Sequence, residues 1–332
     1  MRKIAILFGV LLLSLSDLAA DECRYEVVDR CGCGYIGIEY LYWNLSQVNM
    51  PYAVSLENIA QFSNFTEIRQ HDHWASGFRL FLGAKLFCGI EGRAAWTRFH
   101  NEFKDSFSRS LMIASELLAP NLGLILGGDG IGGPASSKWK IEFDIVDIDL
   151  GTRVCLTNAF SLFPYAGVKG GIIDQMQFIS YDNFVDTDSA NRVNAWVKEK
   201  NNIWVVGPKL GFGSEFLLLS CWRFFSDLGV AILYGNQRSP SSINIDDVTP
   251  YFSKFHTSKW RAIPCFHIRV GIDWNTQVRE CYRLCVGVGY ETQYYWDLWR
   301  TQNSIIQQVY ITDASYGALA MQGLTVKAAF GF

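Results

Sequence analysis

Ionic side chains recur at every second position along several stretches of this sequence, with apolar residues on the alternate positions. In the stretch 259–274, Lys259, Arg261 and Arg269 alternate with Trp260 and Ile268. A strand face of this kind can line a water-filled lumen, because so many charges are costly to keep dry. The candidate lumen-lining residues are Arg79, Arg93, Lys140, Glu142, Asp144, Lys209, Arg223, Asp227, Lys259, Arg261, Arg269, Asp273, Arg283 and Glu291.

The same charges allow a second interpretation. Opposite charges could pair across a narrow lumen and plug it, as side chains do in small barrels. Both signs are present, so the sequence does not imply strong selection for anions or for cations.

His71, Asp72 and His73 are the residues that most invite a metal or an acid–base role. No nucleophile motif, helical metal motif or second ligand pair accompanies them, so we interpret them as a solvated loop end. The glycine-rich run 127–133 lacks the Lys-Ser/Thr pair of a phosphate-binding loop and is interpreted as a loop tip. We therefore predict no enzyme activity, no metal and no cofactor.

Nine cysteines are present, an odd number. The disulfide candidates are Cys23, Cys31, Cys33, Cys88, Cys155, Cys221, Cys281 and Cys285, and only Cys265 falls well inside a predicted strand. Most of them lie in the N-terminal lead or beside short predicted turns. Two interpretations stay open: internal staples or free thiols, and disulfides to neighbouring envelope proteins.

Ten stretches alternate with the period of two that marks a strand. They are 36–42, 74–84, 89–99, 138–153, 161–172, 203–216, 222–234, 259–274, 282–296 and 316–332. Short links (85–88, 154–159, 217–221, 275–281) alternate with long ones (44–73, 100–137, 173–202, 235–257, 297–315). Outer-membrane barrels have this layout, with short periplasmic turns and long external loops. We predict an all-β, antiparallel up-and-down transmembrane barrel of about ten strands, between 8 and 12, rather than a soluble β-sandwich.

The last ten residues show the pattern most clearly. Leu324, Val326, Ala328, Phe330 and Phe332 fall on one face, and small or charged residues fall on the other. The apolar face is predicted to meet lipid, and Lys327 to point into the lumen. By resemblance to other outer-membrane barrels, Phe330 and Phe332 are predicted to form an assembly signal.

Within 138–153 the alternation changes phase. Trp139, Ile141 and Phe143 are the apolar members at first, and Ile148 and Leu150 take over after Val146. One extra residue near Val146 predicts a β-bulge, and two separate strands are the alternative.

The N-terminus has the pattern of a secretory signal. Arg2 and Lys3 precede an apolar run from Ile4 to Leu15, and small residues end at Ala20. We predict a signal peptide over 1–20 rather than a membrane anchor, a periplasmic cysteine-containing lead over 21–33, and a barrel over 34–332. The net charge of −3 gives no reason to expect nucleic acid as a partner.

Several segments resemble one known family. They are Tyr-Leu-Tyr-Trp at 40–43, Ile-Val-Asp-Ile-Asp-Leu-Gly at 145–151, Phe-Pro-Tyr-Ala-Gly-Val-Lys at 163–169, Gly-Pro-Lys-Leu-Gly at 207–211, Gly-Tyr-Glu-Thr-Gln-Tyr-Tyr-Trp at 289–296, and the terminal Phe332. In this order they resemble the Legionella-type major outer membrane protein family, including the MOMP-like porins of environmental chlamydiae. The resemblance implies a pore-forming protein without catalytic residues and, from the chlamydial members, disulfide links into the envelope.

We therefore expect an outer-membrane porin, a passive water-filled channel for small hydrophilic solutes. The alternative is a disulfide-linked structural or adhesive surface protein with little or no pore activity. An outer-membrane protease is a more distant alternative. The expected partners are outer-membrane lipid, small solutes, further copies of the chain (as in a trimer) and envelope proteins.

Overall fold

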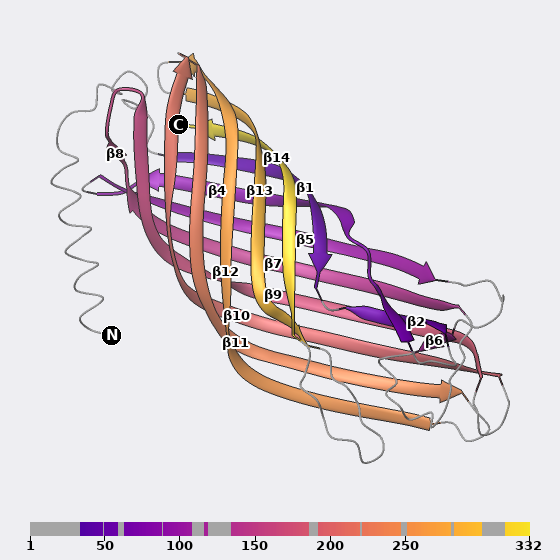
Figure 1. Cartoon of the computed structure of the whole chain (residues 1–332). Helices are drawn as coiled ribbons and strands as arrows, with labels where there is room; N and C mark the ends of the chain where they lie inside the picture. Colours follow the sequence, from indigo (N-terminus) through magenta and orange to yellow (C-terminus); the bar gives the residue numbers. More distant parts are fainter. Residues whose placement is uncertain are drawn as a thin grey trace.

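Strands make up the regular structure of this computed structural model, which describes residues 34–48, 50–58, 63–87, 89–107, 116–118, 134–185, 192–219, 221–246, 251–279, 282–300 and 316–332. Ten strands form one sheet that closes on itself (Figure 1). The barrel strands are β1 (Gly34–Gln47), β4 (His73–Lys85), β5 (Ile90–Phe107), β7 (Ala135–Thr152), β9 (Phe160–Val185), β10 (Arg192–Leu219), β11 (Trp222–Asp246), β12 (Tyr251–Arg279), β13 (Tyr282–Arg300) and β14 (Tyr316–Gly331).

Every neighbouring pair in the barrel is antiparallel, and the ring closes where β14 pairs with β1. The first and last described residues seal this seam, since Gly34 N–H donates to Phe332 O at 3.1 Å and Phe332 N–H donates to Gly34 O at 2.9 Å. The predicted fold class, an antiparallel barrel of about ten strands, is confirmed.

Four short strands lie outside the ring. β2 (Pro51–Asn58), β3 (Ser63–Arg69) and β6 (Glu116–Leu118) form a separate three-stranded sheet, and β8 (Val154–Cys155) pairs with the start of β9. The Tyr181 hydroxyl on β9 donates to Tyr52 O on β2 at 2.6 Å, which ties this small sheet to the barrel.

The two ends of the barrel differ. The strand ends on either side of 86–89, 153–159, 220–221 and 280–281 lie at the end that holds both termini of the barrel, here called the terminal end. The other strand ends lie at the opposite end, here called the loop end. Two predicted long loops, 173–202 and 235–257, are instead mostly strand: β9 continues to Val185, β10 begins at Arg192, β11 continues to Asp246 and β12 begins at Tyr251. The outer faces of these strand parts are polar, so the sequence there lacks the apolar outward stripe by which the other strands were predicted.

Strands β9 to β12 are much longer than a membrane requires. They contain 26, 28, 25 and 29 residues, whereas about 9–11 residues span a bilayer. The register of β12 with β13 begins only at Cys265, and the part of β12 before Cys265 continues towards the loop end without pairing with β13 (Figure 1). We call this distal part of the barrel the extension. Among the described residues no helix is long and apolar enough to cross a membrane.

An apolar outer belt surrounds the terminal half of the barrel. It includes Ile36 and Ile38 on β1, Ile148 on β7, and Val230 and Ile232 on β11, all exposed. A soluble protein rarely exposes so large a continuous apolar surface, and lipid is the solvent that makes it favourable. Leu324, Val326, Phe330 and Phe332 belong to the belt, as predicted.

Aromatic residues mark both margins of the belt. On the loop side, Tyr42 stacks on Trp74 with 5.0 Å between centroids, and Tyr234 stacks on Trp260 at 5.5 Å. On the terminal side, Tyr282 stacks on Phe330 at 5.5 Å. Such girdles sit at membrane interfaces, so they delimit the membrane-spanning part.

The wall changes polarity halfway along the longer strands. On β7, Trp139 to Ile145 are buried inside at alternate positions, whereas Val146, Ile148 and Leu150 face outward. The pairing of β7 with β5 and β9 has no register shift, so the predicted β-bulge near Val146 is wrong. The phase change has another cause. Towards the terminal end from Val146 the outside is lipid and the inside is polar; towards the loop end the outside is water and the inside is a core.

That core closes the extension. The buried apolar side chains from all sides of the ring, here called the plug, are Leu41, Trp43, Leu45, Met50, Ala75, Phe99, Phe103, Trp139, Ile141, Phe143, Ile145, Ile173, Ile203, Val205, Ala231, Leu233, Ile263, Cys265, Tyr295, Leu298, Trp299, Leu319 and Met321. Phe143 on β7 packs edge-to-face on Tyr295 of β13 at 5.6 Å, across the lumen.

Candidate functional site: a charged chamber below the plug

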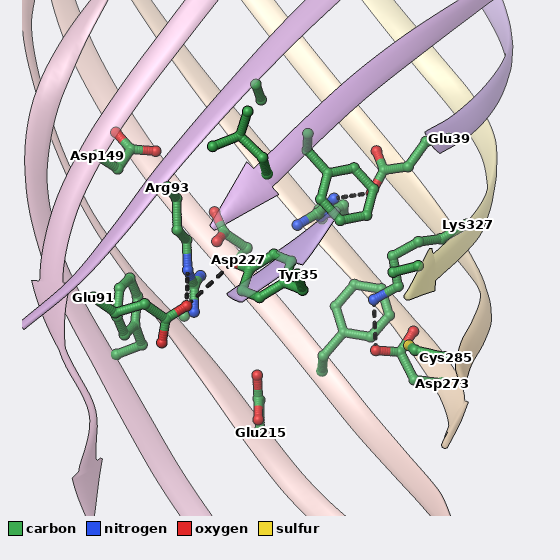
Figure 2. A pocket seen from close by; sticks show the side chains of 18 of the residues that line it. Tyr35, Glu39, Glu91, Arg93, Asp149, Glu215, Asp227, Asp273, Cys285 and Lys327 are labelled. Carbon is green, nitrogen blue, oxygen red and sulfur yellow. Dashed lines mark hydrogen bonds and ion pairs between the residues drawn. The ribbon is translucent and has the colours of Figure 1, made fainter. Parts of the chain in front are cut away.

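The lumen of the terminal half contains a cavity of about 340 Å³, here called the chamber. Its volume is in the range of small-ligand pockets. Ionic side chains from opposite walls point into it, including Glu39, Arg93, Asp227 and Lys327 (Figure 2). The chamber exists because the inward positions of the terminal half are charged or small rather than apolar.

Glycines make room for the rings that line the chamber. A Cβ on Gly211 would lie 2.4 Å from the ring of Tyr165, and one on Gly83 would lie 2.3 Å from the ring of Tyr35. The aromatic rings thus lie directly over backbone of the neighbouring strands. This close approach shapes the chamber wall and fixes both tyrosines.

Arg79 organises the chamber floor, the layer next to the plug. Its guanidinium binds Glu291 in a bidentate manner at 2.7 and 2.9 Å, and donates to Glu39 at 2.6 Å. Arg269 donates to the other oxygen of Glu39 at 2.7 Å. These ion pairs join β4, β13, β1 and β12. The bidentate contact between Arg79 and Glu291 is stronger than a single hydrogen bond and fixes the relative orientation of the two side chains.

A second floor cluster contains the lysines. Lys209 contacts Asp147 at 2.9 Å and Asp149 at 2.8 Å, and Lys169 lies 3.5 Å from Asp147. These four residues come from only three strands, β7, β9 and β10.

Beside this cluster, Asp227 accepts a hydrogen bond from the Tyr165 hydroxyl at 2.9 Å and lies 2.7 Å from His267 Nε2. The Tyr165 hydroxyl is 3.4 Å from the same His267 nitrogen. All three groups are turned toward each other, so the arrangement is a closed polar cluster.

The chamber mouth, the layer nearest the terminal end, holds a third network. Arg223 donates to Glu215 at 2.8 Å and to Asp273 at 2.9 Å, and Lys327 donates to Asp273 at 2.6 Å. Arg153 also binds Glu215. Nearby, Arg93 lies over the ring of Phe163, 3.5 Å from its centroid, and donates to Glu91 at 2.8 Å.

The two layers differ in charge balance. The mouth has six cations (Lys85, Arg93, Arg153, Arg223, Arg283, Lys327) and three carboxylates (Glu91, Glu215, Asp273). The floor has four cations (Arg79, Lys169, Lys209, Arg269) and five carboxylates (Glu39, Asp147, Asp149, Asp227, Glu291). Paired charges of this kind hold opposite walls together, because removing one partner leaves the other buried and uncompensated.

The predicted lumen-lining residues divide into three groups. Nine line the chamber: Arg79, Arg93, Lys209, Arg223, Asp227, Arg269, Asp273, Arg283 and Glu291. Arg261 lies in the extension, where it donates to Gln237 at 2.7 Å, and Lys259 is exposed on the part of β12 that continues past β13. Whether solutes pass these side chains stays a prediction.

Lys140, Glu142 and Asp144 are the third group, and their predicted inward orientation is wrong. They lie on the outer face of β7, where Lys140 contacts Glu142 at 2.5 Å and Asp144 lies 3.7 Å from Arg98. The alternation was correct, but in the extension the polar face is the outer one.

The residues predicted from the sequence to line the lumen did not include five that are central to the chamber: Glu39, Asp147, Asp149, Lys169 and Glu215. Asp147 and Asp149 occupy the same face as Trp139 and Phe143 once β7 is continuous. The change of phase after Val146 was therefore the signal that could have identified them.

The cysteine candidates are only partly described. Cys155 is disulfide-bonded, whereas Cys265 and Cys285 are free thiols; Cys221 is half-buried just before β11. Cys285 is buried and lines the chamber, so its predicted disulfide at the periplasmic rim is wrong. The other candidates, Cys23, Cys31, Cys33, Cys88 and Cys281, lie outside the described residues, as do the predicted signal peptide, the N-terminal lead and the run 127–133.

The histidines at the loop end make ordinary polar contacts. His71 binds Asp105, and His73 stacks on Phe103 with 4.6 Å between centroids. Within the described part of the chain, no group of three or more His, Cys, Asp or Glu residues could hold a metal ion.

A closed antiparallel barrel with an apolar belt, two aromatic girdles and a polar interior defines the class: an outer-membrane β-barrel protein. Residues 35–332 match the family described as "Legionella pneumophila major outer membrane protein precursor". The chain belongs to this family. The predicted family and the outer-membrane location are thereby confirmed.

Comparison with other known proteins finds distant likenesses from which nothing is inferred for this chain. No curated protein matches the chain. The outer membrane protease OmpT from Escherichia coli shares 10% identity over 90% of this chain and 96% of its own, with a TM-score of 0.35. A FadL homologue from Pseudomonas aeruginosa shares 8% identity over 95% and 93%, with a TM-score of 0.32. A major outer membrane protein from Thermus thermophilus shares 11% identity over 90% and 99%, with a TM-score of 0.28. No activity is transferred at these values.

Proposed function

We propose that this protein is a closed outer-membrane barrel that presents a rigid extension at the cell surface, and that it is not a general diffusion porin. The observation that carries the proposal is the contact between Phe143 and Tyr295, whose ring centroids lie 5.6 Å apart across the lumen within the plug of buried side chains. Water and hydrophilic solutes need a continuous polar path, and a dry core provides none.

The proposed orientation follows from the connections. Outer-membrane barrels place short turns in the periplasm and long connections outside. The terminal end, with the connections 86–89 and 220–221, would then face the periplasm, and the extension would stand beyond the outer leaflet. Its outer face is polar, and its interior holds the plug together with buried polar side chains such as Gln175, Glu199 and Gln237.

Planar-bilayer recording of the refolded protein tests the proposal. We expect no conductance steps at high salt from the natural chain. A variant with Phe143→Ala and Tyr295→Ala, which empties the centre of the plug, should conduct, and it serves as the control for insertion. Steps from the natural chain as large as those of this variant would contradict a closed lumen.

A passive channel for small hydrophilic solutes is the second candidate. The chamber supports it, because a cavity of about 340 Å³ lined by charged groups lies below the plug. Passage would require the plug to move. If the natural chain conducts in the bilayer, this second function replaces the first. We propose no reaction for either candidate, since the buried cluster of Tyr165, Asp227 and His267 is internally paired.

A further inference from the structure

The outer faces of β10, β11 and β12 carry a group of cations just beyond the membrane belt. Trp204, Asn236 and Trp260 lie in register across these strands and form the girdle, with Trp204 and Trp260 packed at 5.2 Å. The next outward row towards the loop end is Asn202, Arg238 and Ser258. Arginine is thus the first charged residue above the belt on this side.

Two further rows extend the same surface. His256 lies opposite Pro240, and Lys198 and Lys254 flank Ser242 from either side. Lys200 lies between the rows on β10. We call Lys198, Lys200, Arg238 and His256 the basic patch; Lys200, Arg238 and His256 are exposed.

Over the rows that hold the basic patch, the described outward positions of these strands, at 196–202 on β10, 236–244 on β11 and 254–260 on β12, carry no carboxylate; the next row towards the loop end has Asp246 opposite Asn194. The adjoining strand β9 contributes Asp174, which lies opposite Asn202 and acts on Lys200. One carboxylate therefore borders three cations of β10 and β11, Lys198, Lys200 and Arg238.

The strands on the other side of β9 show the contrast. On β5 and β7, three of the four outward lysines and arginines meet an acid: Arg98 lies 3.7 Å from Asp144, Lys138 lies 2.8 Å from Glu102, and Lys140 lies 2.5 Å from Glu142. The fourth, Lys104, acts electrostatically on Glu102. Carboxylates thus accompany the outward cations of β5 and β7, whereas among the described residues of the rows above Asp174 is the one carboxylate beside Lys198, Lys200 and Arg238.

The height of the basic patch matches lipid headgroups. Two residues advance about 7 Å along a strand, and strand tilt reduces this to about 5 Å along the membrane normal. Arg238 then lies in the headgroup layer, and Lys200 and Lys198 stand within reach of it, since long basic side chains extend toward the interface. We propose that the basic patch binds the anionic, phosphate-bearing headgroups of outer-leaflet lipids. The proposal is independent of whether the lumen conducts.

Native mass spectrometry of the folded protein in neutral micelles tests this, with phosphatidylglycerol and phosphatidylcholine as the probes. The natural chain should retain phosphatidylglycerol preferentially. A variant with Lys198→Gln, Lys200→Gln and Arg238→Gln should lose about fivefold of that preference for each cation removed. The matched control carries Arg98→Gln, Lys138→Gln and Lys140→Gln, which removes the same number of cations from the paired wall.

We expect the control to keep the preference of the natural chain. An equal loss in both variants would show a net-charge effect and overturn the proposal. Absence of a preference in the natural chain would overturn it too. Heat-modified gel mobility verifies that each variant is folded before its lipids are counted.

Discussion

Asp273 on β12 accepts hydrogen bonds from Arg223 on β11 at 2.9 Å and from Lys327 on β14 at 2.6 Å. β14 is not a sheet neighbour of β12, because β13 lies between them. The side chain of Asp273 is 1% exposed, so this carboxylate joins the walls of the chamber mouth out of contact with bulk water.

Replacing Asp273 by Ala should therefore destabilise the barrel strongly. Arg223 and Lys327 would keep their charges without their shared partner, and breaking a buried ion pair costs about 3–5 kcal/mol. Urea unfolding in detergent micelles measures the loss. The control is Asp297→Asn, because that side chain is 59% exposed and 3.8 Å from Arg261, and Asn tolerates the positive φ of 52° at this position. It should change stability by less than about 1 kcal/mol. Equal losses of unfolding free energy in the two variants would mean that the ion pairs of the mouth do not stabilise the barrel more than an exposed ion pair does.

A methyl group on Gly211 should displace Tyr165. The added Cβ would lie 2.4 Å from the Tyr165 ring, so we expect Gly211→Ala to cost about 1–3 kcal/mol. Gly213 lies on the same strand, where the nearest atom to an added Cβ is 3.7 Å away, and Gly213→Ala is the matched control. Thermal unfolding in micelles compares the two; a control as unstable as Gly211→Ala would argue against the ring contact.

Glu199 should make the stability of the extension fall as the pH rises from 4.5 towards 8. This carboxyl lies on β10 beyond the belt, is 3% exposed, and neither of its oxygens has a hydrogen-bond partner. Burial raises the pKa of Glu199 to about 8 from the ordinary value of 4.5. Its contribution to the free energy of unfolding is thus complete below pH 4.5 and is lost as the pH rises towards 8, by roughly 1.4 kcal/mol per pH unit.

Glu199→Gln removes this ionisation while it keeps the shape of the side chain. Stability measured from pH 5 to pH 9 should therefore fall less steeply in the variant than in the natural chain, so that the two curves diverge as pH rises. Parallel curves would show that Glu199 does not titrate in this range.

The polarity of β7 can be tested on intact cells. Lys140 faces outward in the extension and Ile141 is fully buried in the plug. With the proposed orientation, Lys140→Cys should react with an impermeant maleimide and Ile141→Cys should not, beyond the background of the natural thiols. Rapid labelling of Ile141→Cys together with protection of Lys140→Cys would reverse the assignment of the two faces.

The sequence by itself determined the barrel, its strand number and its lipid-facing stripes, because a period of two reports which residues share a face. It also located the short connections, and it identified most of the chamber cations. Alternation cannot say which face is the inner one, since that depends on the solvent outside. Where the solvent is lipid, Val146 and Ile148 face out and Asp147 faces in; where it is water, Lys140 faces out and Ile141 faces in. Only the tertiary structure decided where that change occurs, because the plug forms from side chains of strands that are distant in sequence, as Phe143 and Tyr295 are.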